Sequence, residues 1–180
     1  FARNSDAVLA AELAAYKPDL IVLAFGTNEG FDADFNPDIY METLRGQVRR
    51  LRRLAGRNVP VMLLGPPNAM TRNWKIASAG GWSPTLCDTG LLVPGNLAAV
   101  RMAQRVVAAD MGLAYWDWAR AMGGECAMYQ WREQGLTFRD AVHFNRFGGM
   151  RLGAQLQADF QQAMFGEAAG NASSQRSGSQ

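Results

Sequence analysis

The sequence contains few of the residue types that bind metals or form covalent cross-links. Among its 180 residues there are one histidine, His143, and two cysteines, Cys87 and Cys126. A zinc site needs several histidine, cysteine or carboxylate ligands at close spacing, and these three residues do not form such a motif. We therefore expect no metal and no cofactor. Whether the two cysteines form a disulfide or remain free buried thiols stays open at this point.

A strong charge of either sign is also missing. The net charge is +2, from 18 basic and 16 acidic residues. This excess is too small to make nucleic acid or an anionic membrane surface the main partner. Arginines do gather between residues 37 and 57, but an apolar stripe in the same segment favours a solvated helix face over an anion-binding surface.

Long apolar runs and phosphate-binding glycine loops are absent as well. No apolar run reaches the roughly 18 residues that a membrane-spanning helix needs. No G-x-G-x-x-G pattern follows an apolar run, which excludes a dinucleotide-binding fold of the usual kind. The chain starts with Phe1, so we expect a natural N-terminus, and any export signal, to lie upstream.

Short apolar runs alternate with helical patterns along the chain. Residues 1–166 are expected to form most of one domain, and residues 167–180, which lack large apolar side chains, a disordered tail. The alternation predicts βαβ units and an α/β fold with a parallel sheet covered on both faces. Strands are expected at 20–25, 61–64 and 113–116. Helices are expected at 5–16, capped by Ser5 or Asn4, at 36–55, capped by Asn36, and at 96–111 and 146–165. Residues 68–94 are expected to be irregular, and residues 129–138 irregular or weakly helical.

Two further expectations concern the apolar run at residues 20–25 and the residues directly after each strand. The run has the composition of a strand that is buried on both faces. Ligands bind beyond the carboxyl ends of parallel strands, so the residues after each strand are candidates. These candidates are Gly26-Thr27-Asn28-Glu29, Gly65-Pro66-Pro67-Asn68 and Asp117.

The histidine has a carboxylate three residues before it. Asp140 can accept a hydrogen bond from one ring nitrogen of His143, which leaves the other nitrogen free to act as a base. A sole histidine is also compatible with an ordinary surface residue. Asn28 can donate its side-chain amide to a developing oxyanion, with Thr27 and Glu29 shaping the loop, or it can simply cap that loop.

The order of these motifs resembles the SGNH (GDSL-like) serine ester hydrolases. Gly26-Thr27-Asn28 matches the third sequence block of that family, and Asp140-Ala141-Val142-His143 matches the fifth. The forms GTNE and DAVHF look most like the branch with bacterial peptidoglycan O-acetylesterases. The resemblance covers roughly residues 5–165. It implies a three-layer α/β/α, flavodoxin-like fold with a parallel sheet that apparently lacks its first strand.

The resemblance also implies roles for single residues. Asn28 would be an oxyanion donor, His143 the general base and later acid, and Asp140 the carboxylate that orients it. Gly26, Thr27 and Glu29 would contact substrate. Trp131 is a candidate for stacking on a sugar, with a place in the core as the alternative.

The family's Gly-Asp-Ser block, which supplies the nucleophile, has no counterpart among the seven serines. We therefore expect these residues to be the C-terminal portion of an SGNH domain that is inactive and marginally stable alone. The whole protein is expected to hydrolyse acyl, chiefly acetyl, esters on a small molecule or polysaccharide, in the periplasm or outside the cell. The alternatives are an acyltransferase acting on an exopolysaccharide and a non-catalytic SGNH-like binding domain.

Overall fold

Three parallel strands form the centre of the fold. A computed structural model describes residues 4–87 and 90–174, the last nine of these as backbone only. The strands are β1 (Ile21–Ala24), β2 (Val61–Leu64) and β5 (Ala114–Trp116), in the order β1-β2-β5. Ile21 pairs with Val61, and Met62 with Ala114. A short antiparallel hairpin, β3 (Thr85–Leu86) and β4 (Leu92–Val93), lies outside this sheet. The predicted parallel sheet is confirmed.

The four predicted long helices are present, and two of them begin at the expected capping residues. Ser5 accepts a hydrogen bond from the N–H of Val8, and Asn36 accepts from Asp38 and Ile39. In chain order the helices are α1 (Asp6–Tyr16), η1 (Glu29–Phe31), α2 (Pro37–Leu54), α3 (Trp74–Ala77), η2 (Ala79–Gly81), α4 (Gly95–Met111), α5 (Trp118–Ala121), α6 (Ala127–Glu133) and α7 (Arg146–Ser174). Of these, η1 and η2 are short 3-10 helices.

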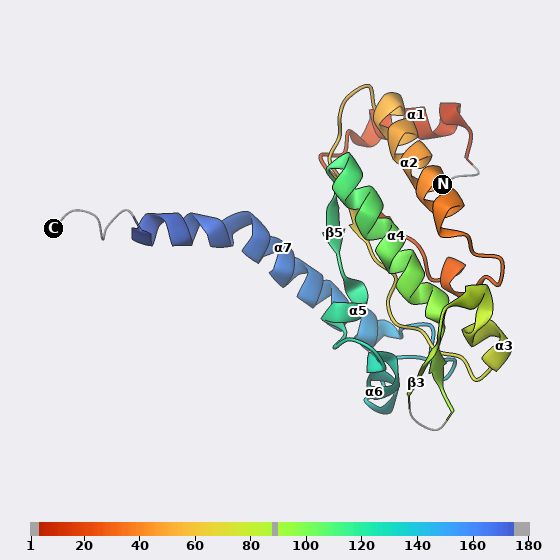
Figure 1. The fold of residues 1–180 in the computed structure, drawn as a ribbon. Helices are drawn as coiled ribbons and strands as arrows, with labels where there is room; N and C mark the ends of the chain where they lie inside the picture. Colours follow the sequence, from red (N-terminus) through yellow and green to blue (C-terminus); the bar gives the residue numbers. More distant parts are fainter. Residues whose placement is uncertain (1–3, 88–89, 175–180) are drawn as a thin grey trace.

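The two faces of the sheet have separate apolar cores. Alternate residues of a strand point to opposite faces, so Leu63 faces one core while Leu64 faces the other. The first core packs against α2 and α4, which run next to each other in Figure 1. The second contains Trp116, Trp131 and, from α7, Leu152. Helices on both sides of a parallel sheet give the α/β/α layering that the sequence predicted.

The expectation that the first strand is buried on both faces is wrong. Within β1 only Leu23 is buried, whereas Val22 is 46% exposed and Ala24 is exposed. The reason is the position of β1 at the edge of the described sheet. Helix α7 contacts α5, and its Asp159 bonds to Trp116 of β5, so it covers the second face at the opposite edge.

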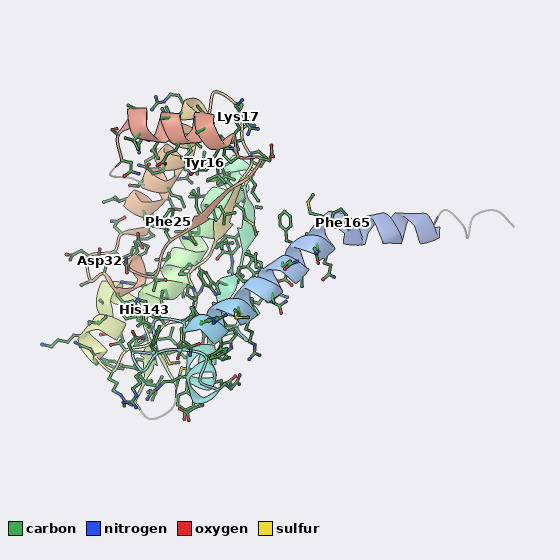
Figure 2. The ribbon with its side chains drawn as sticks, turned by 180° about the vertical axis from the view of Figure 1, so that it is seen from behind. Tyr16, Lys17, Phe25, Asp32, His143 and Phe165 are labelled. Carbon is green, nitrogen blue, oxygen red and sulfur yellow. A yellow bond between two sulfur atoms is a disulfide. The ribbon has the colours of Figure 1, made fainter. Side chains whose placement is uncertain are left out.

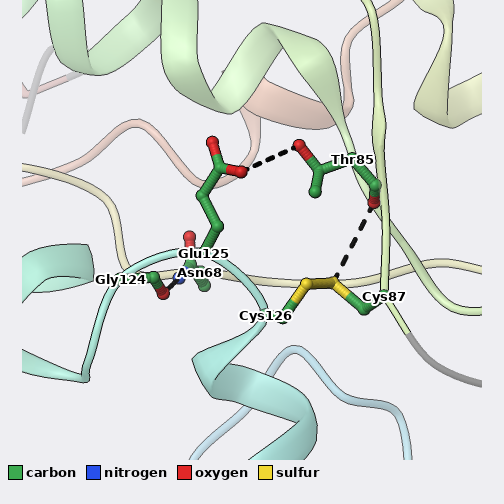
Figure 3. The surroundings of a disulfide bond; sticks show 6 residues. All are labelled: Asn68, Thr85, Cys87, Gly124, Glu125 and Cys126. Carbon is green, nitrogen blue, oxygen red and sulfur yellow. Dashed lines mark hydrogen bonds between the residues drawn. A yellow bond between two sulfur atoms is a disulfide. The ribbon is translucent and has the colours of Figure 1, made fainter.

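Residues 68–94, predicted to be irregular, contain short regular elements, and the weakly helical alternative for residues 129–138 fits the structure. Asn73 caps α3 through the N–H of Lys75, and the β3–β4 hairpin follows within the same segment. A disulfide between Cys87 and Cys126 joins this hairpin to the start of α6 (Figure 3). Residues 127–133 are helical because α6 buries one face, including Met128, in the second core.

The last helix is longer than the 146–165 expected. Helix α7 continues to Ser174, and residues 175–180 lie outside the described residues. The disordered tail at residues 167–180 stays a prediction. Alanine-rich sequence continues an existing helix easily, since each added residue brings one backbone hydrogen bond. Phe165 lies on the part of α7 that projects from the body (Figure 2). Across the described part of the chain, no helix has the length and apolarity to cross a membrane.

Candidate active site

The loop after β1 turns sharply at Gly26. Its φ is +115°, and a Cβ on Gly26 would lie 2.7 Å from Cγ1 of Val100, so the position suits glycine in both respects. The Gly26 carbonyl accepts a hydrogen bond from the N–H of Gly30 at 3.0 Å, which starts η1. Asn28 precedes η1, is exposed, and makes no side-chain capping bond. The capping alternative for Asn28 therefore finds no support, and its amide is open to a ligand.

A second loop holds Asp140 and His143 together. Asp140 Oδ2 lies 2.8 Å from His143 Nδ1, and Asp140 Oδ1 accepts hydrogen bonds from the N–H groups of Val142 and His143 at 2.9 and 3.0 Å. Ala141 between them has a φ of +56° and is buried. Its carbonyl accepts from the N–H of Met70 at 2.9 Å, which fixes the loop on the core.

The same contacts set the ionisation of Asp140. Partial burial on its own would raise the pKa of this carboxyl. The hydrogen bonds from the His143 backbone and ring and from the Val142 N–H outweigh burial, so the pKa of Asp140 is below its ordinary value. Asp140 is therefore a carboxylate at neutral pH, able to hold Nδ1–H of His143 and leave Nε2 free.

A cavity of about 480 Å³ brings the two loops together. Thr27 and Asn28 line it from one side and His143 from the other, although they are more than 100 positions apart in the sequence. Figure 2 shows His143 in the opposite half of the body from Tyr16 and Lys17. The remaining lining is apolar and consists of Ala24, Phe31, Pro67, Trp118, Val142 and Phe144.

The chemistry available in the cavity is that of a base beside a hydrogen-bond donor. The ring of His143 is 73% exposed and can reach a ligand, and the amide of Asn28 can bind an oxygen that gains negative charge. The polar side chains of the lining are those of Thr27, Asn28 and His143. Of these three, His143 is the one strong metal ligand.

Aromatic packing behind the cavity explains the position of Trp131. The ring of Phe144 stacks on Trp118, with centroids 5.8 Å apart and 13° between planes, and meets Trp131 edge-on at 5.8 Å. Trp131 is 3% exposed, and its indole N–H donates to the Met122 carbonyl at 2.9 Å. Of the two expectations for Trp131, stacking on a sugar and a place in the core, the structure supports the core, where Trp131 contacts Phe144.

Two of the other predicted residues also lie outside the lining. Gly26 is buried behind the loop, and Glu29 is the first residue of η1. Both shape the segment that presents Asn28.

Some lining residues were missed by sequence reasoning. Pro67 belongs to the segment after β2 that the strand-end rule had selected, whereas Trp118, two residues after β5, was not selected beside Asp117. Val142 and Phe144 flank His143 and reach the cavity through the tight turn at Ala141. Phe31 had no signal in the sequence.

Comparisons with known proteins fit this geometry. No family model and no curated protein matches the chain. A solved structure of a peptidoglycan O-acetylesterase does, with a TM-score of 0.67 and 29% identity over 86% of this chain. The chain has the fold of the SGNH/GDSL hydrolases. It spans 40% of the length of that esterase.

Two further solved structures share the SGNH fold at lower identity. A carbohydrate acetylesterase, Est24 from Sinorhizobium meliloti, matches with a TM-score of 0.58 and 18% identity over 90% of this chain and 69% of its own. A lipase/acylhydrolase from Enterococcus faecalis matches with a TM-score of 0.58 and 20% identity over 86% of this chain and 67% of its own. At these identities the likeness establishes the fold alone.

Proposed function

We propose that the protein hydrolyses acetyl esters on a carbohydrate or cell-wall polymer by a Ser-His-Asp mechanism. The observation that supports this most directly is the 2.8 Å contact between Asp140 and His143 in a cavity shared with Asn28. The solved structures with this fold include two enzymes described as acetylesterases of peptidoglycan and of carbohydrate.

The reaction divides between three groups of this chain and a serine. His143 Nε2 takes the proton of the serine hydroxyl while the serine oxygen forms a bond to the ester carbonyl carbon. Asn28 donates its amide N–H to the carbonyl oxygen as it becomes negative. The protonated His143 then gives its proton to the leaving sugar oxygen as the C–O bond breaks. Water, deprotonated by His143, releases acetate from the acyl-enzyme, and Asp140 stabilises the imidazolium in both halves.

The serine is proposed to come from outside these 180 residues. None of the lining residues is a serine. Ser78 follows α3 and Ser83 precedes the hairpin, and neither lines the cavity. The outer edge of β1 has no neighbouring strand among the described residues, and Val22 leaves the adjoining face partly exposed. A strand added there would end next to Thr27 and Asn28, where a nucleophile is needed.

The disulfide supports a site of action outside the cytoplasm. Disulfides persist in oxidising compartments and are rare in the cytosol. We therefore place the protein in the periplasm or among secreted proteins, where Cys87–Cys126 stays oxidised.

Acetyl-ester hydrolysis by the protein expressed with its natural upstream residues tests this function. We expect turnover of 4-nitrophenyl acetate, lost in His143→Ala and reduced about 10²- to 10³-fold in kcat by Asn28→Ala, which removes one oxyanion donor. Asp140→Asn is expected to cost about 10⁴-fold in kcat, because the imidazole loses its productive tautomer. A matched control is Asn73→Ala, which removes a capping amide at α3.

Two results would reject the proposal. Turnover that survives His143→Ala would show that His143 is not the base. Equal rates for Asn28→Ala and the Asn73→Ala control would show that Asn28 is not the oxyanion donor. Adding a carbohydrate acceptor separates hydrolysis from acyl transfer, since a transferase would form an acetylated sugar at the expense of free acetate.

A further inference from the structure

A second cavity, of about 720 Å³, lies at the free edge of β5. One side comes from α4 through Arg105, and the opposite side from α7 through Gln155 and Asp159. Residues of β5 and α5 lie between them. We call this the edge cavity. None of the residues assigned above to ester hydrolysis lines it.

Backbone groups of β5 face the edge cavity. The N–H of Gly65 donates to the Trp116 carbonyl at 2.9 Å, so Trp116 turns its backbone toward β2. In a parallel ladder, neighbouring residues of a strand direct their backbone N–H and C=O groups alternately to the two edges of that strand. The N–H and C=O of Tyr115 therefore point away from β2 and toward the edge cavity, where no other strand of the described chain pairs with them.

The side chains of the edge cavity are polar and balanced in charge. Arg105 forms an ion pair with Asp117, and its guanidinium lies 5.4 Å from the ring centroid of Tyr115. Asp159 accepts hydrogen bonds from the Trp116 indole and from Gln155, each at 2.8 Å. Arg120 is exposed at the rim.

This balance selects the class of ligand. The lining contains two guanidinium groups and two carboxylates, so its net charge is zero. Neither an anion nor a cation therefore gains a net electrostatic attraction. Fixed donors and acceptors of both kinds suit a neutral ligand with hydroxyl and amide groups, since each hydroxyl both donates and accepts. A sugar unit has this chemistry, and the volume lies in the range of small-molecule sites.

The edge cavity and the cavity of His143 are lined by consecutive residues at the start of α5. Asp117 lines the edge cavity, and the next residue, Trp118, lines the cavity of His143. The rings of Trp116 and Trp118 are 6.2 Å apart. We propose that the edge cavity binds a neutral sugar unit of the polymer whose neighbouring unit presents its ester to His143. The proposal rests on the function proposed above and extends it to a polymeric substrate.

Binding of a neutral oligosaccharide tests the edge cavity without requiring catalysis. The probe is a tetramer of β-1,4-linked N-acetylglucosamine, added to the ¹⁵N-labelled chain and followed by NMR. The reporter is the indole N–H signal of Trp116, assigned by its loss in Trp116→Phe. We expect a saturable shift of this signal, and about tenfold weaker binding in Arg120→Met and in Asp159→Asn, as for one lost hydrogen bond to a charged group.

Matched variants show whether the effect is local. Arg49→Met removes an exposed guanidinium of α2, paired with Glu42, and is expected to leave the affinity unchanged. An unshifted Trp116 signal, or equal affinities for Arg120→Met and Arg49→Met, would overturn the proposal. Oligosaccharide binding here, with no esterase activity in the protein expressed with its upstream residues, would refute the function alone. Esterase activity of that protein without such binding would refute the edge cavity alone.

Discussion

Removal of the Cys87–Cys126 disulfide is expected to lower stability sharply. The bond joins residues 39 positions apart. In the chain-entropy treatment, a loop of this length restricts the unfolded chain by an amount worth about 4 kcal/mol at 25 °C. Because domains of this kind are stable by only about 5–15 kcal/mol, the bond provides a large share of the total.

The native contacts around the bond are expected to survive its removal. Thr85 Oγ1 lies 3.2 Å from Glu125 Oε2, and the Asn68 amide donates to the Gly124 carbonyl (Figure 3). The first contact keeps the hairpin beside the start of α6 in the folded state, and the second holds the turn before α6 on the segment after β2. The loss therefore arises mainly in the unfolded chain, which gains freedom.

Urea unfolding measures this effect. We compare the chain with Cys87→Ala/Cys126→Ala by tryptophan fluorescence, and use dithiothreitol on both. With an m-value of about 2 kcal/mol/M, the midpoint is expected to fall by about 2 M in the double variant and in the reduced chain, whereas the reductant leaves the double variant unchanged. A difference below about 1 kcal/mol in the free energy of unfolding would refute the loop-entropy argument.

Three further predictions concern the site and its support. Gly26→Ala is expected to destabilise the chain by about 1–3 kcal/mol, measured by the same unfolding assay, because a Cβ at a φ of +115° meets Val100. Trp131→Ala is expected to cost about 3–5 kcal/mol, and an unchanged midpoint would contradict its place in the core. Since the folded pKa of Asp140 is lowered, its stabilisation is present above the unfolded pKa of about 3.8 and lost as pH falls through the folded pKa. The stability difference between the chain and Asp140→Asn should therefore shrink from pH 6 to pH 3; a constant difference would contradict the hydrogen bonds to this carboxylate.

The fold was largely predictable because its signals are local. Continuous apolar runs gave the strands, and the capping residues Ser5 and Asn36 placed two helix starts correctly. The exposure of β1 was not predictable, since a run such as Leu20–Phe25 has the same composition in a central strand and at an edge. Edge position depends on which other strands are present, and that is a property of the assembled sheet.

The candidate site was predictable only where residues adjoin in sequence. Asp140 and His143 lie three residues apart, so their contact could be expected from the sequence, and Asn28 followed from its place after a strand. The wall formed by Phe31, Trp118 and Phe144 could not be expected, because three distant segments supply it. For Trp131 the residue type allowed a sugar-binding surface, but its burial in the structure excludes contact with a sugar.

Labelling by a fluorophosphonate tests most directly the claim that this chain supplies the base and oxyanion donor for a serine located elsewhere. The reagent reacts with a serine that a neighbouring base activates, and mass spectrometry locates the modified peptide. In the protein expressed with its upstream residues, the account predicts one labelled serine outside residues 1–180 and loss of labelling in His143→Ala. Label on Ser78 or Ser83, or label that persists in His143→Ala, would contradict it.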